Sequence, residues 1–476
     1  MFNLQPAGQN CYKVEKQGRM KADVLVYLNK TLFENYCDDK SIEQLIDAAS
    51  LPGVISPVIG MPDIHTGFGL PIGGVMAMDP VNGLISAGAV GMDINCGVRL
   101  LQTNIAAKEV NKDTLKKLIR AIGNRVPSGV GEKSKHAALI KSHFHRLVHK
   151  GVPYLVELGF GRSEDVDVIE SRGWMDGADM AAVSKKAEER GLQLSTIGGG
   201  NHFVEIGYVN KVFDQALASA MNIQIGQLTV LIHTGSRGFG HQICTDYSAV
   251  MKKAAKKYDL DIPSDGLASV PVSSGEGKEY FAAMACAINF AFCNRQWITD
   301  DVRKAFISAM GGSEREYGLD LVYDLAHNTA RFDTVGDRKM LIHRKGATRA
   351  LPPGHADNPK RYLTTGHPVL IPGSMGSLSY IVTACPGVET IFNSVNHGAG
   401  RVLSRRAAKR NITVDDFRKE LGEVIVSGAN YHSYLDEAPQ AYKDIDMVID
   451  TFTEIDMIKK VASLKPLAVL KGAGND

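Results

Sequence analysis

The 476-residue chain has an ordinary composition for a globular protein, with 44% hydrophobic and 22% charged residues and a formal net charge of +2. This near-neutral charge excludes nucleic-acid binding by a uniformly basic surface, so any such binding must use local Lys/Arg patches. No segment is apolar for about 18 residues, which predicts no membrane span. The seven cysteines include no CxxC pair, which indicates reduced thiols in a cytoplasmic protein.

Apolar periodicity predicts helices over residues 41–50, 108–123, 175–190, 239–258 and 278–310. Short aliphatic runs bounded by Gly and Pro predict strands over residues 98–103, 228–232, 319–323 and 369–371. No internal repeat or low-complexity linker separates these elements. The chemically distinctive residues extend from Asp93 to Lys471, so we expect one large catalytic domain over residues 1–476.

Four histidines, His202, His233, His327 and His397, lie beside glycines or small polar residues. His233 directly follows one predicted strand, and His327 comes shortly after another. Ligands at strand ends are a common way to build a preorganised site. A lone histidine is usually a hydrogen-bonded core residue, but that interpretation does not account for four of them together with an Asp/Cys pair.

Asp93 and Cys96 are three residues apart in a turn-like stretch, close enough to bind one ion or to share two. A thiolate can bridge two metal ions while the imidazoles of His202, His233 and His327 complete the coordination. Cysteine with histidine favours zinc, but a mixed Asp/Cys/His set with open positions also accommodates Mn²⁺. The ligand types therefore predict a metal site and leave the metal open.

Two glycine-containing loops, residues 372–376 and 397–400, can bring backbone N–H groups close to a phosphate, although each can equally be a tight turn. His397 is followed by Arg401 and Arg405, and a helix here would place all three on one face. A nucleophilic histidine with nearby cations suits attack on phosphorus, because the cations neutralise charge on the transferring group.

Other candidates allow two interpretations. The basic stretch with His143, His145 and His149 favours a solvated helix face over a site. Residues 343–349 form a charge run that is either surface or a phosphate-contact loop. Glu205 either binds a base edge or orients a ligand.

The motifs occur in the order found in the RtcB family of RNA ligases, which this chain resembles over nearly its whole length. They read MPDIHTG at 61–67, GMDINCGVR at 91–99, GNHF at 200–203, HTGSRG at 233–238, YDLAHN at 323–328, HGAGR at 397–401 and LKG at 470–472. The resemblance implies an α+β domain of the family's own type with a central metal and nucleotide site. It further implies a GTP- and Mn²⁺-dependent ligase that joins an RNA 3′-phosphate or 2′,3′-cyclic phosphate to a 5′-hydroxyl. The intermediates would be a guanylyl-histidine at His397 and RNA-3′-pp-5′-G.

The resemblance also assigns roles to residues. Two Mn²⁺ ions are expected at Asp93, Cys96, His202, His233 and His327. Guanylate contacts are expected from Asn201, His202, Phe203, Glu205, His327, Asn328, Pro372, Gly373, Ser374, Met375, Ser379, His397, Gly398, Ala399, Gly400, Tyr442 and Lys471. RNA-phosphate contacts are expected from Arg237 and Arg405. The implied partners are tRNA halves or other cleaved RNA, and archease, with no membrane.

Two other functions compete with this one. A dinuclear metal phosphoesterase would use the same metal ligands without GTP, but it leaves His397 and the distant Lys471 without a function. A non-catalytic RNA-binding subunit needs only basic patches, which the near-neutral charge does little to support.

Overall fold

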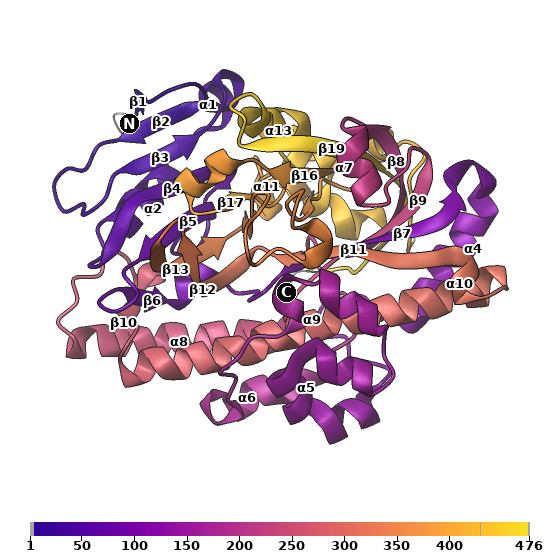
Figure 1. Cartoon of the computed structure of the whole chain (residues 1–476), viewed down its shortest axis with the longest axis horizontal. Coiled ribbons are helices and arrows are strands. Elements are labelled where there is room, and N and C mark those ends of the chain that lie inside the picture. Colours follow the sequence, from indigo (N-terminus) through magenta and orange to yellow (C-terminus); the bar gives the residue numbers. More distant parts are fainter. Residues whose placement is uncertain (1–3, 429, 475–476) are drawn as a thin grey trace.

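The computed structural model describes residues 4–428 and 430–474, and in it two large sheets lie beside a layer of long helices (Figure 1). Most strand pairs are antiparallel; β3–β4 and β18–β19 are parallel. This arrangement confirms the predicted α+β class. No helix in the described part of the chain is long and apolar enough to cross a membrane.

The seven-stranded sheet has the order β1-β2-β3-β4-β5-β13-β12. Its strands are β1 (Gln5–Pro6), β2 (Cys11–Val14), β3 (Val24–Tyr27), β4 (Val54–His65), β5 (Ile72–Met78), β13 (Arg338–Lys345) and β12 (Asn328–Val335). Two short pairs accompany the large sheets: β6 (Leu84–Ser86) with β10 (Ser269–Pro271), and β14 (Ala347–Arg349) with β17 (Ser394–Asn396).

The second sheet has the order β11-β7-β9-β8-β19-β16-β15, with β18 paired to β19. Its strands are β11 (Gly318–Ala326), β7 (Gly97–Ala106), β9 (Gln227–Thr234), β8 (Phe203–Val212), β19 (Ile458–Lys471), β16 (Ser379–Ala384), β15 (Val369–Ile371) and β18 (Ile425–Val426).

The longest helix, α9 (Gly275–Met310, 36 residues), is buried on nearly all sides from Ala283 to Phe306. The charged side chains that it buries there include Arg295 and Arg303, which pair with Asp324 and Asp165. The helix packs against α4 (Lys112–Arg125), α5 (Ala137–Glu157) and α8 (Arg237–Lys257). The other helices are α1 (Lys30–Tyr36), α2 (Asp39–Ala49), α3 (Ala87–Val90), α6 (Lys185–Glu188), α7 (Gln215–Ala220), α10 (Glu314–Tyr317), α11 (Arg405–Asn411), α12 (Val414–Leu421) and α13 (Ile445–Thr453).

Most predicted elements are confirmed, and two are wrong. The helix predicted at 175–190 is instead a series of short turns, because Asp179 and Ser184 each cap a new one by accepting from the N–H of Ala181 and Ala187. The charge run 343–349 is not exposed surface, although its Lys345 and Gly346 line a pocket. It forms the buried strands β13 and β14, in which Arg344 is paired with Asp333. The basic histidine stretch does lie on the solvated face of α5.

Strand pairing gathers the motifs at one end of the eight-stranded sheet, where β7 and β8 begin and β9, β11 and β19 stop; we call this end the sheet edge. Antiparallel pairing sets the start of β7 beside the ends of β9 and β11, with Val98 opposite His233 and Gly97 opposite Ala326. Phe203, at the start of β8, faces both His233 and Lys471, the last residue of β19. The chain crosses into the other sheet at His327, which separates β11 from β12. Residues hundreds of positions apart therefore meet at this edge.

A buried ion-pair cluster braces this edge. Arg99 and Arg295 pair with Asp324 at 2.6 and 2.9 Å, and all three side chains are completely buried. Arg295 also donates to the backbone oxygens of Asn95 and Thr234, at 2.8 and 3.0 Å. These oxygens lie next in sequence to Cys96 and His233, so the cluster fixes the backbone that carries both residues.

We expect Asp324→Asn to destabilise the protein by about 3–5 kcal/mol, because it leaves two buried guanidinium groups without a counter-charge. The midpoint of urea unfolding measures this loss. Asp415→Asn is the matched control: it removes an exposed partner of Arg418 and should change stability by no more than about 0.5 kcal/mol. Equal effects of the two substitutions would contradict a bracing role for the cluster.

Candidate metal and nucleotide site

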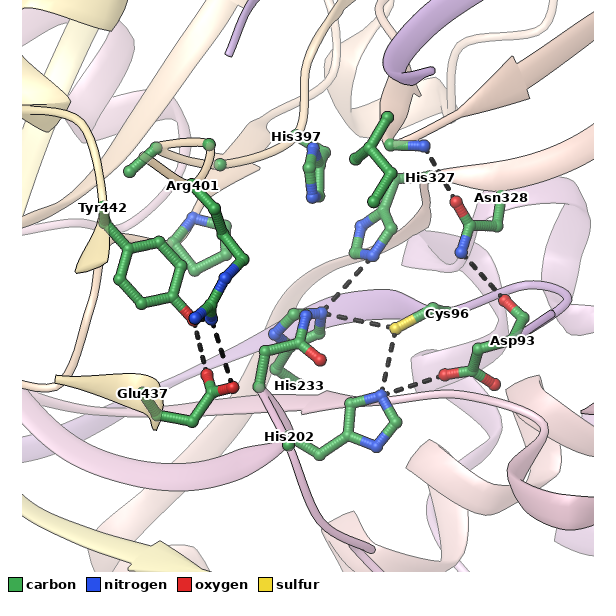
Figure 2. A pocket seen from close by; sticks show the side chains of 18 of the residues that line it. Asp93, Cys96, His202, His233, His327, Asn328, His397, Arg401, Glu437 and Tyr442 are labelled. Carbon is green, nitrogen blue, oxygen red and sulfur yellow. Dashed lines mark hydrogen bonds and ion pairs between the residues drawn. The ribbon is translucent and has the colours of Figure 1, made fainter. Parts of the chain in front are cut away.

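The sheet edge opens into a pocket of about 360 Å³, and Figure 2 shows how its side chains converge. The predicted site residues that line it are Asp93, Cys96, Asn201, His202, Phe203, His233, His327, Asn328, Pro372, Gly373, Ser374, Met375, His397, Gly398, Ala399, Gly400, Arg405, Tyr442 and Lys471. Glu205, Ser379 and Arg237 are not part of the pocket wall.

Cys96 Sγ lies at the centre of two ligand groups. One group contains Asp93, Cys96 and His202, and the other contains Cys96, His233 and His327. The sulfur is 3.3 Å from His202 Nε2 and 3.4 Å from His233 Nε2, and the Nε2 atoms of His233 and His327 are 3.4 Å apart. Metal–ligand bonds of roughly 2.0–2.3 Å in a tetrahedral site would separate neighbouring ligand atoms by about 3.3–3.8 Å. The spacing therefore fits metal ions on both sides of a shared sulfur.

The protonation states fit the same function. Burial lowers the pKa of His233 and His327 well below the ordinary value, so both imidazoles are neutral and able to bind a cation. Burial and the charge of Asp93 raise the pKa of the Cys96 thiol to about 11. Burial also opposes ionisation of Asp93, but hydrogen bonding and charge from His202 outweigh it and lower the pKa of this carboxyl. A metal ion would displace the thiol proton and complete the charge balance of the cluster.

Asp93 is oriented by its neighbours. Its Oδ1 accepts from the Ser236 N–H and hydroxyl at 2.8 and 3.1 Å. Its Oδ2 is buried, 2.9 Å from His202 Nε2. Asn328 donates to the Asp93 backbone oxygen and accepts from the Gly346 N–H, so its side chain braces two loops of the pocket (Figure 2).

The structure does not support the expected RNA contact of Arg237. This side chain is completely buried behind the metal ligands, with Nη1 3.3 Å from His202 Nδ1 and Nε donating to Thr196 Oγ1. A guanidinium enclosed in this way cannot reach an RNA phosphate in this conformation. Its position instead suits orientation of His202 and charge balance near Asp93.

His397 is held by Asp63, a residue to which the sequence motifs assigned no role. The ring Nδ1 lies 2.7 Å from Asp63 Oδ2, and the same oxygen accepts from the backbone N–H groups of His397 and Gly398 at 3.1 and 3.2 Å. With Nδ1–H donating to this carboxylate, the lone pair is on Nε2. The His397 ring lies 4.7 Å from the His327 ring, between centroids, so the nucleophile candidate adjoins the metal ligands.

The segment that carries Asp63 is clamped in place. Gly400 has a φ of +75°, and a Cβ there would overlap the Asp63 backbone oxygen, so only glycine permits this approach. The buried Lys443 ammonium donates to the oxygens of Pro62 and Ile64 at 3.1 and 2.7 Å. Residues 397–404 form no helix, so the face that His397, Arg401 and Arg405 would share in a helix does not exist; α11 begins at Arg405.

Several backbone N–H groups of the two glycine loops already donate hydrogen bonds within the protein, which the phosphate-binding interpretation does not expect. The Gly373 N–H donates to Ser379 Oγ at 3.1 Å and the Ser374 N–H to Ser377 Oγ at 2.6 Å, which is the tight-turn alternative. The N–H groups of His397 and Gly398 are likewise bound by Asp63. Ser379 therefore supports the loop from behind.

The pocket wall opposite the metal cluster is built around a buried carboxylate. Glu437 accepts from Arg405 and from the Tyr442 hydroxyl, and Arg401 Nη1 lies 3.3 Å away (Figure 2). The Lys471 ammonium is 3.9 Å from the same carboxylate. Burial opposes ionisation of Glu437, but the three cations outweigh it and lower the pKa of this carboxyl. The wall keeps a surplus of positive charge, which suits a phosphorylated ligand.

Glu205 lies outside this wall, on β8 opposite Val469. Burial raises the pKa of its carboxyl to about 8, with the charge of Lys471 opposing the shift. Glu205 is therefore neutral near pH 7 and able to donate a hydrogen bond. Sequence patterns gave no signal for Glu437 or Lys443, but Asp63 lies inside the MPDIHTG motif and was detectable there.

Comparison with known proteins identifies the chain. The family model described as tRNA-splicing ligase RtcB matches residues 44–472. The tRNA-splicing ligase RtcB of Thermococcus kodakarensis is 43% identical over 465 residues, 95% of each chain. The enzyme of the same name from Archaeoglobus fulgidus is 43% identical over 461 residues, again 95% of each chain. The RNA-splicing ligase RtcB of Mycobacterium tuberculosis is 41% identical over 437 residues, 90% of this chain and 100% of its own. The chain belongs to the RtcB family.

Proposed function

We propose that this protein is an RNA ligase that joins an RNA 3′-phosphate or 2′,3′-cyclic phosphate to a 5′-hydroxyl, using GTP and Mn²⁺. The observation that carries the proposal is one pocket holding two ligand groups that share Cys96 and, beside them, His397 oriented by Asp63. The names of the relatives, tRNA-splicing and RNA-splicing ligases, support the same reaction class. Site residues from Asp93 to Lys471 line one pocket, which supports the proposal of a single catalytic domain.

In the proposed first step, His397 Nε2 attacks the α-phosphorus of GTP. A P–N bond forms, the bond to the β-phosphate oxygen breaks, and pyrophosphate leaves. Asp63 keeps the proton on Nδ1 and stabilises the positive charge that develops on the ring. Lys471, Arg405 and Tyr442 line the wall where the guanylate would bind.

In the second step an oxygen of the RNA 3′-phosphate attacks the same phosphorus, which releases His397 and gives RNA-3′-pp-5′-G. The 5′-hydroxyl then attacks the 3′-phosphorus, GMP leaves, and the hydroxyl proton passes to solvent. A cyclic phosphate is first opened by water. Bound at Asp93, Cys96 and the three histidines, the metal ions would supply charge neutralisation at phosphate and a lower pKa for a bound water or hydroxyl.

The competing phosphoesterase interpretation explains only the metal ligands. It gives no function to an Asp63-oriented imidazole that faces a cationic wall across the pocket. The non-catalytic RNA-binding interpretation gives no reason to bury two ligand groups around a single thiol. Archease stays a candidate partner within the proposal.

The metal affinity should rise with pH through Cys96. From about pH 6 to pH 8 this thiol is protonated, since its pKa is about 11, whereas His233 and His327 are neutral. Binding must displace the thiol proton, so each added pH unit should strengthen Mn²⁺ binding about tenfold. Calorimetric titration measures the slope. Cys96→Ser should lose this pH dependence of Mn²⁺ affinity, most of the bound metal and the ligation activity. A Cys96→Ser variant that keeps its metal content and activity would show that Cys96 is not a metal ligand.

His397 is tested by incubation with α-labelled GTP and Mn²⁺. The wild type should hold label in a P–N bond that is labile in acid and comparatively stable in base, and His397→Ala should take up none. That variant should still seal RNA supplied as RNA-3′-pp-5′-G, because sealing needs no enzyme nucleophile. Asp63→Asn should slow labelling by roughly 10²–10⁴-fold through misorientation of the ring. Label retained in His397→Ala would place the nucleophile elsewhere.

Arg405 is the remaining candidate for a phosphate contact, with a side chain 35% exposed at the pocket wall. Arg405→Ala should reduce the salt dependence of RNA binding by roughly one unit of log–log slope at most. Filter binding over a range of salt concentrations measures it. If the variant instead loses guanylylation and keeps the slope, Arg405 serves GTP and not RNA.

A further inference from the structure

One aromatic side chain of the pocket is exposed and has no function in the proposed ligation steps. Phe68 lines the pocket, and 53% of its surface is exposed. Met92, which precedes the metal ligand Asp93, lines the same pocket and is 40% exposed. Exposed apolar surface that is rimmed by polar residues is typical of ligand-binding grooves.

The backbone beneath Phe68 is rigidly fixed. The Lys345 ammonium donates to the Phe68 backbone oxygen and, at 3.0 Å, to that of Gly88. The neighbouring Gly67 exchanges two hydrogen bonds with the side chain of Gln44, at 2.6 and 3.1 Å. Gly69 has a φ of +75°, and a Cβ there would overlap the Gly266 backbone oxygen. The ring is therefore exposed on a segment that cannot easily fold it inward.

The position of the ring favours the RNA over the guanine of GTP. Lys345 connects Phe68 to Gly88, and its side-chain carbons lie 3.4–3.7 Å from the Cβ position of Gly91, two residues before Asp93. The guanylate residues Phe203 and Lys471 come instead from β8 and β19, where they face one another. Phe68 and the metal ligands line one pocket, so an RNA end whose phosphate is bound at the metals brings its terminal nucleoside into the pocket that Phe68 lines.

We propose that Phe68, in the same pocket as the exposed Met92, is a stacking platform for a terminal nucleobase of the RNA whose end phosphate or hydroxyl reacts at the metals. Stacking on an aromatic ring tolerates every base, because each base has a π-face. The platform therefore positions an RNA end without selecting its sequence. This inference rests on the proposed function, since it assumes that the pocket ligates RNA.

The test compares Phe68→Ala, Phe68→Leu and Phe68→Trp with the control Phe213→Ala, which removes an exposed aromatic ring outside the pocket. Phe68→Ala should raise the RNA concentration for half-maximal ligation roughly 5- to 150-fold, as expected for one lost stacking contact. Labelling by GTP should be unchanged, which also reports an intact fold. Phe68→Trp should restore RNA use, and Phe68→Leu, apolar but without a π-face, should not.

RNAs with an abasic site at the 3′-terminal or the 5′-terminal nucleotide identify the stacked base. If the removed base normally stacks on Phe68, the abasic RNA should be ligated less well by the wild type. Phe68→Ala should ligate the abasic RNA and the intact RNA equally well, because this variant already lacks the stacking contact. Three outcomes would each overturn the inference. Phe68→Ala could use RNA as well as the wild type, or it could lose GTP labelling as much as RNA use. The third outcome is that each abasic RNA and Phe68→Ala impair ligation additively, which would point to a protein partner for Phe68. A wild type that neither labels nor ligates would instead refute the proposed function.

Discussion

The burial of a carboxylate, a thiol and three imidazoles with their donor atoms 2.9–3.4 Å apart is the constraint on which the rest of the site depends. Burying polar atoms without hydrogen-bond partners costs folding free energy. Here the potential metal-ligand atoms mostly face one another, and few of them face a hydrogen-bond donor. Cations held between them would convert this cost into binding energy. Before a cation binds, the protein scaffold must hold these ligand atoms in place. The strand ends that carry them and the buried Arg99–Asp324–Arg295 cluster serve this purpose.

The same scaffold connects the metal ligands to the nucleophile candidate. His327 is the single residue between β11 and β12, so one side chain joins the edges of both large sheets. Its ring adjoins that of His397, whose own orientation comes from Asp63 near the end of β4 in the seven-stranded sheet. The pocket thus forms where two sheets meet. A shift of either sheet would move the nucleophile relative to the metal ligands, which makes the relative position of the sheets part of the chemistry.

Several features were predictable from sequence because they depend on local pattern. Aliphatic runs that stop at His233 and His327 indicated ligands at strand ends, and the Asp93/Cys96 spacing indicated a shared thiolate. Features that depend on tertiary packing were not predictable. Arg237 reads as a basic residue in a glycine-rich motif, but α8 buries it behind His202. Residues 343–349 form a charge run that predicts either surface or a phosphate-contact loop, but Asp333 pairs with Arg344 and allows the run to be buried in strands. Glu437 has no local signal at all.

Anomalous diffraction can show whether a pair of metal ions shares the Cys96 sulfur beside His397. Crystals grown with Mn²⁺ should show two anomalous peaks at the manganese edge, roughly 3.5–4 Å apart, one on each side of Cys96 Sγ. One peak should lie near Asp93 and His202, and the other near His233 and His327. A single peak away from the sulfur, or no peak at saturating Mn²⁺, would show that Cys96 does not bridge two metal ions.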